Sequence, residues 1–409
     1  MKRVPCIFLL VLLIFSQKIN AQNLSDFDKV TYKIGNNSIA PIISKVTDSI
    51  KIVGLGESSH YTKEYYQYKN LIINDLLRNR SFEAVIFEVD FGTALLWDEY
   101  VTKGIGNIDS ILTDCSWWTY QTKEFKQVLE DIKTINGNRP QKIRIFGMEM
   151  TYIPGVIDLI DSFYLENYEG VNKDIILKQL HYVRDSIDLM AFTYHNVEEI
   201  NVLLELNDLV YSSIEEFNDN NLDLSNLRIA NNILNQFITY VTNRNQYAQL
   251  KLRDQFSFTN IQWFTYMNAI DKFVIWAHSG HIQNTYHYPQ LGLYLKQEYK
   301  DKYHSIGFDY GTGENGSRTP NQILEGLSFE LELNSASFYL YNNYDSDLYV
   351  NLIEARNNSL LNFPVIVRNT LSEYTDIKTF NPNRNLVLPE INDGMIFIRN
   401  TSLPTKISE

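Results

Sequence analysis

The stretch Val53-Gly54-Leu55-Gly56-Glu57-Ser58-Ser59-His60 decides the fold that we predict for this chain. Its first half is a short apolar run that stops at a glycine, which is typical of a strand covered on both faces of a parallel sheet. Its second half places a carboxylate and an imidazole three residues apart in the loop that follows. Apolar residues between positions 64 and 77 recur at helical spacing, so we expect a helix next. A carboxylate and an imidazole held together at a strand end suit proton transfer or metal binding.

The composition indicates a globular protein with an acidic surface. The chain has 409 residues, of which 44% are hydrophobic and 21% are charged, and its formal net charge is −13. This is enough apolar material for a core, and the length allows one large domain with an insertion or two to three domains. The negative charge argues against nucleic acid and against anionic membranes as partners.

The N-terminus resembles a secretory signal peptide. Lys2 and Arg3 precede an apolar run from Ile7 to Phe15, and cleavage is expected near Ala21, so residues 1–21 would be removed. The mature protein would then be secreted or periplasmic; an uncleaved anchor is the alternative. Cleavage would leave Cys115 as a lone cysteine, unable to form an internal disulfide. No later apolar stretch is long enough to span a membrane.

Short apolar runs rich in β-branched residues alternate with helical patterns along the first part of the chain. This alternation predicts an α/β fold with a mostly parallel sheet flanked by helices. The expected strands are 52–55, 84–87, 143–146, 273–276 and 305–308.

Two regions depart from the alternation. Residues 156–250 show only helical periodicity, which predicts a helical insertion. The last part of the chain shows strand-like alternation and indicates a small mixed α+β portion. The predicted organisation is a core at 22–155, a helical insertion at 156–250, the core again at 251–315, and a C-terminal mixed subdomain at 316–409. A helix is expected at 39–50, and further strands are expected at 327–333, 338–341, 365–367 and 395–398.

Ionisable side chains follow most of the expected parallel strands. Because ligands bind beyond the carboxyl ends of the strands in open parallel sheets, these side chains are predicted to face one cleft. The residues at the strand ends are Glu57, His60, Glu88, Glu149, His278, His281 and Asp309.

Each candidate also has a structural interpretation. Glu88 would serve as a helix N-cap or an exposed loop acid, and His278 as a hydrogen-bonded structural histidine. Arg253 and Asp254, on an expected helix, would belong to a surface or interhelical ion pair. Clustering favours function, because perturbed ionisable groups gather at active sites.

Several other chemistries lack their sequence signals. The chain has no Gly-x-Ser-x-Gly elbow and no Gly-x-x-x-x-Gly-Lys-Ser/Thr phosphate loop. Cys115 has no evident catalytic partner in the sequence and is predicted to be packed. Without a strong nucleophile, the favoured chemistry is water activated by a general base.

The ordered motifs resemble those of the erythromycin esterase family. The segment from Gly56 to His60 resembles the family's Gly-Glu-Ala-Thr-His signature, and the segment from Trp276 to His281 resembles its Trp-Ala-His-Asn-x-His strand end. Between them, in the expected order, lie Phe87-Glu88-Val89-Asp90, Trp117-Trp118, Gly147-Met148-Glu149 and Arg253-Asp254 with Asn260. Ser257 stands in place of a usual Met, Ser279 in place of Asn, and Glu149 in place of a more usual Asp.

The resemblance implies a metal-independent hydrolase, without a cofactor, that opens an ester or macrolactone ring, with macrolide antibiotics as the leading candidate substrates. It implies that His60 is the general base on water and that Glu57 orients it. His278 and His281 would bind the ester oxygen or return a proton to the leaving alkoxide. Glu88 and Arg253 would hold the water and neighbouring charges, and a protonated histidine or Arg253 would stabilise the oxyanion.

Two competing hypotheses stay open at this stage. The same residues, Glu57, His60, Glu88, His278 and His281, are plausible ligands for Zn or Mn in a metal-dependent hydrolase. The chain could also be a binding protein on the same scaffold with no turnover.

Overall fold

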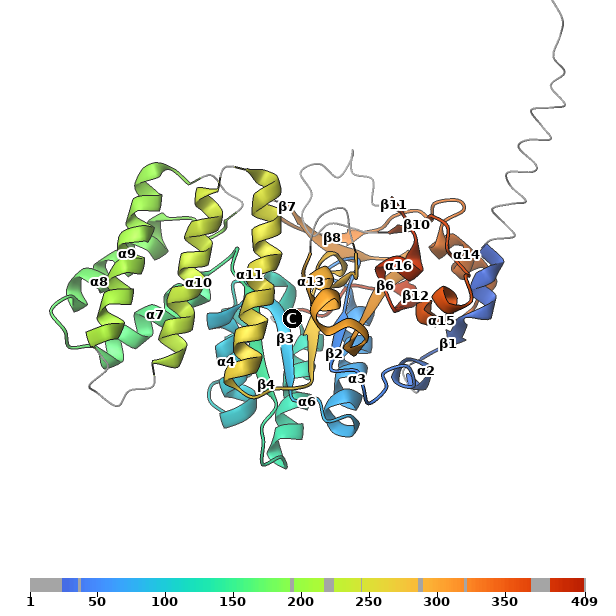
Figure 1. The fold of residues 1–409 in the computed structure, drawn as a ribbon, viewed down its shortest axis with the longest axis horizontal. Coiled ribbons are helices and arrows are strands. Elements are labelled where there is room, and N and C mark those ends of the chain that lie inside the picture. The colour runs from blue at the N-terminus through green and yellow to red at the C-terminus, as the bar shows by residue number, and fades with distance from the viewer. Residues whose placement is uncertain are drawn as a thin grey trace, which may run out of the picture. The chain divides into compact units, whose positions relative to one another are not determined.

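The computed structural model describes residues 24–35, 38–191, 195–216, 224–243, 245–285, 290–319, 322–368 and 383–407. The predicted signal peptide at 1–21 lies outside these residues. The chain divides into two compact units (Figure 1), and we describe each by itself. Unit 1 comprises Met1–Asp75, Ala277–Tyr286 and Tyr299–Thr405. Unit 2 comprises Leu76–Trp276, His287–Glu298 and Lys406–Glu409.

Unit 1 contains five strands of a mixed sheet in the order β1-β9-β12-β6-β2. Strands β2 and β12 both pair in parallel with β6, whereas β9 pairs antiparallel with β12 and with β1. The strands are β1 (Thr31–Lys33), β2 (Ile52–Leu55), β6 (Tyr303–Gly313), β9 (Leu348–Asn351) and β12 (Gly394–Thr401). Every residue of β2 and β9 is buried, as expected for near-continuous apolar runs covered on both faces.

The helices of unit 1 are mostly short. The long exception is α3 (Lys63–Asn79), which follows β2 as predicted and ends in unit 2. The others are α2 (Ala40–Ile43), α12 (Ser279–Ile282), α14 (Ala336–Asn343), α15 (Leu352–Asn357) and α16 (Leu388–Ile391), with 3-10 turns at Ser25–Lys29 and Lys300–Lys302. Two antiparallel pairs complete the unit, β7 (Asn315–Thr319) with β8 (Gln322–Leu327) and β10 (Val365–Arg368) with β11 (Asn383–Leu386). One apolar core joins Phe27 to Leu340, Leu348 and Phe397.

Unit 2 contains three parallel strands in the order β5-β3-β4. They are β3 (Ala84–Asp90), β4 (Arg144–Glu149) and β5 (Phe273–Trp276). The helices that follow β3 are α4 (Phe91–Lys103), α5 (Ile108–Thr113) and α6 (Lys123–Gly137), with a 3-10 turn at Trp118–Tyr120. Helix α13 (Leu291–Tyr299) comes later in the chain, after β5. Phe87 makes T-shaped ring contacts with Trp97 and Phe125, which connect β3 to both α4 and α6. The α/β class predicted from the sequence is confirmed.

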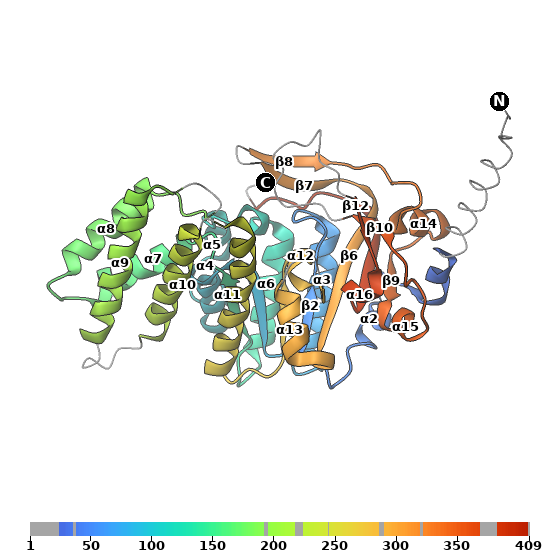
Figure 2. The same ribbon diagram turned by 45° about the horizontal axis from the view of Figure 1, so that its top comes forward.

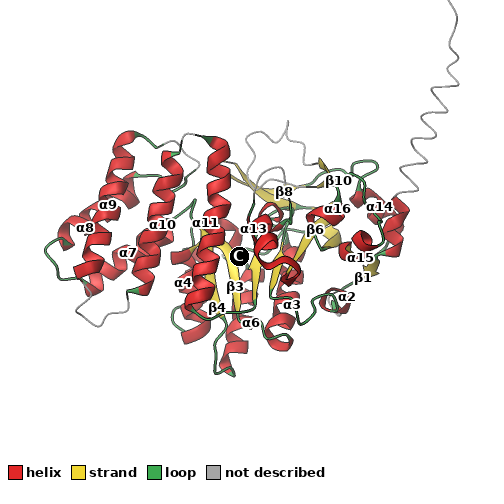
Figure 3. Cartoon of the chain, viewed as in Figure 1, coloured by secondary structure: helices red, strands yellow, loops and turns green. Residues whose placement is uncertain are grey.

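In the residues described after β4, unit 2 has five successive helices. They are α7 (Pro154–Asn167), α8 (Lys173–Ser186), α9 (Val197–Glu216), α10 (Ser225–Thr242) and α11 (Gln246–Met267). Helices α7 to α10 lie side by side in Figures 1 and 2, and Figure 3 draws the described residues of this part of the chain as helices and loops. Their inward faces carry the residues that gave the helical periodicity, among them Leu203, Leu206, Leu234 and Phe237. The boundaries predicted for the insertion and for the other domains stay predictions.

Three local predictions were wrong. The predicted strand at 327–333 ends at Leu327, because the carbonyl groups of Phe329 and Glu330 accept hydrogen bonds from Arg368 instead of from a neighbouring strand. The predicted strand at 338–341 is the helix α14, since Ser335 caps its first turn and Leu340 buries one face. The helix expected at 39–50 is only the single turn of α2, followed by turns.

In the described part of the chain, no helix has both the length and the hydropathy needed to cross a membrane.

Candidate active site

The loop after β2 is held in place by its own polar side chains. The Oγ of Ser58 lies 2.6 Å from the hydroxyl of Tyr65, and the hydroxyls of Ser59 and Thr62 are also 2.6 Å apart. Tyr66 donates to the carbonyl of His60 at 2.9 Å. Three of these partners lie at the start of α3 or just before it, so the helix that follows the strand fixes the shape of the loop.

Gly56 is required for a close approach within unit 1. A Cβ at this position would lie 2.7 Å from the Oγ of Ser279 and 3.2 Å from its Cα. The backbone N–H of Ser279 donates to the carbonyl of Glu57 at 2.9 Å. The glycine therefore lets the loop after β2 lie against the segment that carries His278 and His281.

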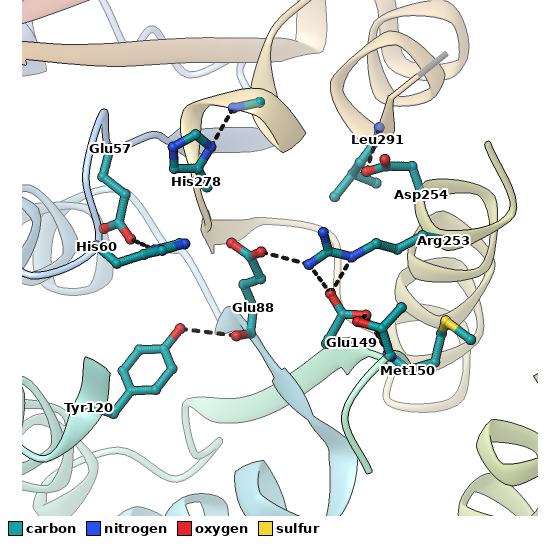
Figure 4. A network of polar contacts seen from close by, with 12 residues as sticks. Glu57, His60, Glu88, Tyr120, Glu149, Met150, Arg253, Asp254, His278 and Leu291 are labelled. Atoms are coloured by element: carbon teal, nitrogen blue, oxygen red, sulfur yellow. Dashed lines mark hydrogen bonds and ion pairs between the residues drawn. The ribbon is translucent and has the colours of Figure 1, made fainter. Parts of the chain in front are cut away.

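Glu57 is hydrogen-bonded on one oxygen to His60 and forms a buried ion pair with Lys69 through the other (Figure 4 shows Glu57 and His60). The Nδ1 of His60 lies 2.5 Å from Oε1 of Glu57, and the Nζ of Lys69 lies 2.5 Å from Oε2. Glu57 is 4% exposed and Lys69 is completely buried. Because the ionised carboxylate can only accept a hydrogen bond, Nδ1 of His60 carries the proton, and the neutral His60 ring has its lone pair on Nε2. This is the tautomer that a general base on water needs.

The charge of Lys69 keeps Glu57 ionised. Burial raises the pKa of the Glu57 carboxyl, but the charge of Lys69 and the hydrogen bond from His60 outweigh burial, so the pKa lies below its ordinary value. Ionised Glu57 therefore adds stability above the pKa of an unfolded glutamate, about 4.3. That contribution is lost as the pH falls through the lower pKa of the folded state.

Lys69 was missed by the sequence-based prediction. It lies twelve residues after Glu57, and an isolated lysine in a helix is ordinarily solvent-exposed. The available signal was its position, because Tyr65, Lys69, Ile72 and Leu76 fall on one face of α3 and all are buried. A lysine in the apolar stripe of a helix needs a buried partner, which here is Glu57.

We expect Lys69→Met to move the acidic limb of the activity–pH profile toward higher pH. Glu57 stays buried in this variant but loses its cationic neighbour, so its pKa rises and a protonated Glu57 no longer accepts from His60. The measurement is kcat/KM against pH. Lys69→Arg, which keeps the charge, should restore most of the profile, and Lys33→Met, at an exposed pair in the same unit, should leave it unchanged. An unshifted profile in Lys69→Met would contradict this role.

His278 and His281 belong to the same unit as His60. The His278 ring lies 5.1 Å from the His60 ring, centroid to centroid, and the planes are inclined by 55°. His278 is the N-cap of α12, and its Nδ1 accepts from the N–H of Gly280 at 3.2 Å (Figure 4). A neutral His278 therefore carries its proton on Nε2, as a hydrogen-bond donor. His281 lies within α12 and is 8% exposed.

A second charged cluster lies in unit 2, around Arg253. Its Nη2 lies 2.9 Å from Oε1 of Glu88 and 2.5 Å from Oε2 of Glu149, and its Nε donates to the same Glu149 oxygen at 2.8 Å (Figure 4). Glu88 is 7% exposed and Glu149 is 1% exposed. Burial lowers the pKa of the Arg253 guanidinium, but Glu149 and Glu88 outweigh it and raise the pKa above its ordinary value. The cluster carries two carboxylates against one cation.

Backbone features at the ends of β3 and β4 position this cluster. The register between the two strands shifts between Phe87 and Asp90, and a Cβ on Gly147 would lie 2.4 Å from the carbonyl oxygen of Asp90. Tyr120 donates to the carbonyl of Glu88 at 3.2 Å. The other oxygen of Glu149 accepts from the N–H groups of Met150 and Thr151, each at 2.8 Å. Glu149 is thus fixed on both oxygens.

The predicted site residues fall into two groups. Glu57, His60 and His278 are brought together in unit 1, with His281 one helical turn away from His278. Glu88 and Arg253 are brought together in unit 2. The sequence left open a surface ion pair for Arg253, but its ion pairs with Glu88 and Glu149 are buried. Asp254 instead accepts from the N–H of Leu291 at 3.1 Å. The convergence of both groups on one cleft stays a prediction.

Two further observations concern alternative chemistry. Among the residues that the structure describes, no group of three or more His, Cys, Asp or Glu side chains has the geometry to hold a metal ion. Cys115 is buried, and burial raises the pKa of its thiol to about 12. The thiol is therefore protonated at neutral pH, as expected for a packed rather than a nucleophilic cysteine.

Comparison with known proteins assigns the chain to a family. A sequence profile described as erythromycin esterase matches residues 77–401. The chain belongs to the erythromycin esterase family.

Individual relatives are distant. Erythromycin esterase type II of Escherichia coli is 19% identical over 315 residues, which span 68% of this chain and 73% of that protein. A crystal structure of a Bacillus cereus protein superposes with a TM-score of 0.77 at 18% identity, covering 95% of this chain and 99% of the other. A mutant of the erythromycin esterase EreC in its open conformation gives a TM-score of 0.64 at 15% identity, covering 90% and 94%. At these identities the structural likeness shows the fold alone.

Proposed function

We propose that this protein hydrolyses a carboxylic ester or macrolactone with a water molecule activated by His60. The observation that carries the proposal is the 2.5 Å contact between Nδ1 of His60 and a Glu57 carboxylate whose other oxygen is held by Lys69. This arrangement leaves Nε2 of His60 as a base and stabilises the imidazolium that forms when the water loses its proton. Membership of the erythromycin esterase family supports the reaction class.

The remaining residues of the proposal have distinct roles. His278, whose Nε2 carries the proton in the neutral ring, would donate to the ester oxygen as negative charge develops on it, and His281 would support the return of a proton to the leaving alkoxide. Glu88 and Arg253 would hold the attacking water and the neighbouring charges. Macrolide antibiotics are the leading candidate substrates, because the E. coli relative is an erythromycin esterase.

The proposal includes export of the protein. The basic and apolar N-terminal residues support cleavage near Ala21 and a secreted or periplasmic location. N-terminal sequencing of the mature protein would establish whether that cleavage occurs.

Incubation with a panel of 14- and 16-membered macrolides and simple esters is expected to convert at least one compound to a product heavier by one water. Mass spectrometry of the reaction is the measurement. Because the proposed base is a histidine, a chelator should leave the rate unchanged. Loss of activity on chelation with recovery on added metal would instead support a metal-dependent hydrolase. Tight binding with no product from any compound would support a binding protein.

A further inference from the structure

Unit 2 contains a cavity at the opposite end of its strands from Glu88 and Glu149. Its volume is about 610 Å³, and its lining residues come from α4, α10, α11 and the segments that lead into β3, β4 and β5. Arg144 opens β4 and Glu149 closes it, so the two ends are roughly 16 Å apart at about 3.3 Å per residue. The cavity is within the size range of small-molecule sites and is separate from the charged cluster around Arg253.

The charges that line this cavity compensate one another. Asp98 accepts from Nε of Arg144 at 3.0 Å and from the N–H of Ile145 at 2.7 Å, so this pair is anchored in the cavity floor. Glu99 pairs with Lys103 at 3.0 Å. The lining acids are Glu83, Asp98 and Glu99, and the lining bases are Lys103, Lys142 and Arg144. Equal numbers of opposite charges favour a ligand without net charge.

A partly exposed tryptophan also lines the cavity. Trp263 on α11 is 37% exposed, and the structure gives its side chain no hydrogen bond or ring contact with any other described residue. Its neighbour Phe264 is buried and stacks on Phe146, with the two ring centroids 4.2 Å apart. The floor contains buried apolar side chains such as Ile145 and Ile229, whereas Asn226 and Gln141 are exposed amides at the lining. The lining therefore combines an aromatic platform with neutral hydrogen-bonding groups.

We propose that this cavity binds a neutral saccharide, with one sugar ring stacked on Trp263. A pyranose has an apolar C–H face, which matches an indole, and a rim of hydroxyl groups, which matches amides and compensated charges. A disaccharide fits the volume. This inference does not depend on the esterase function, because none of the residues that carry it belongs to the proposed catalytic groups.

Isothermal titration calorimetry of the full chain tests the proposal. The probes are maltose, cellobiose and N,N′-diacetylchitobiose, with glucuronate and glucosamine as the acidic and basic comparisons. We expect at least one neutral disaccharide to bind more tightly than both charged sugars. Trp263→Ala should weaken that binding by about tenfold or more, which corresponds to about 1.4 kcal/mol. Trp263→Phe, which keeps an aromatic face, should weaken it less.

Two controls separate this cavity from other sites. Tyr266→Ala removes an aromatic side chain on the same helix that is 83% exposed and does not line the cavity, so binding should be unchanged. His60→Ala should also bind normally, which would place the ligand outside the proposed catalytic groups even if no ester is ever hydrolysed. The proposal fails if no neutral disaccharide binds at 10 mM, if a charged sugar binds more tightly, or if Trp263→Ala binds as the parent does.

Discussion

His60→Ala is expected to lower kcat on any ester that the protein hydrolyses by roughly 10²–10⁴-fold, the usual contribution of a positioned general base. The imidazole is the group that would take the proton from water, and its orientation is set through Nδ1 by Glu57. Alanine removes the base and leaves Glu57 paired with Lys69. The loss should therefore appear in kcat, with a smaller change in KM.

The comparison for this variant is His181→Ala. His181 is 56% exposed and approaches Asp161 at 3.5 Å in unit 2, so its removal should leave kcat within about twofold of the parent, as for a surface substitution. Glu57→Gln keeps a hydrogen-bond acceptor beside His60 but removes the charge, and an intermediate loss is expected. Full activity in His60→Ala, with the fold intact by circular dichroism, would exclude His60 as the base.

The strands were predictable from sequence wherever burial alone determined them. Ile52–Leu55 and Phe273–Trp276 begin and end where the apolar runs do, because every residue in them is buried. The region from 327 to 341 was not predictable in this way. Its aromatic and alternating residues favour strands, but a capping Ser335 and the guanidinium of Arg368 supply its backbone with other partners. The Ser335 cap is local, but the Arg368 contacts connect segments about 40 residues apart, which local patterns do not report.

The candidate site shows the same division. Glu57, His60, Glu88 and His278 were identified because parallel strands expose their carboxyl ends at one edge. The residues that pair with them, and so set their charge states, were not identified from the sequence. Lys69 has the sequence context of a surface lysine, and only the position of α3 in the fold shows that it is buried. Glu149 was identified as a residue at a strand end but was not included among the predicted site residues. Its role depends on Arg253, 104 residues later in the chain.

Arg253→Leu is expected to destabilise unit 2 by about 3–5 kcal/mol, the usual cost of removing one partner from a buried ion pair. The leucine would leave Glu88 and Glu149 buried without their cation, and both are less than one-tenth exposed. At about 2 °C per kcal/mol, the melting temperature should fall by roughly 6 °C or more. Differential scanning calorimetry is the measurement, with Arg228→Leu as the matched control. Arg228 is 45% exposed and lies 3.8 Å from Glu215, so its loss should cost about 0.5 kcal/mol or less.

A double variant separates the charge from the packing of Arg253. In the double variant Arg253→Leu with Glu149→Gln, a neutral amide replaces one of the two carboxylates that lost their cation, so part of the lost stability should return. If the single variant melts as the parent does, the ion pairs drawn in Figure 4 do not hold the ends of β3 and β4. If it is destabilised and the double variant recovers nothing, the cost lies in the packing of the arginine stem. Recovery would show that Arg253 mainly keeps two carboxylates charged in a buried place, a condition that the proposed role of Glu88 in holding water requires.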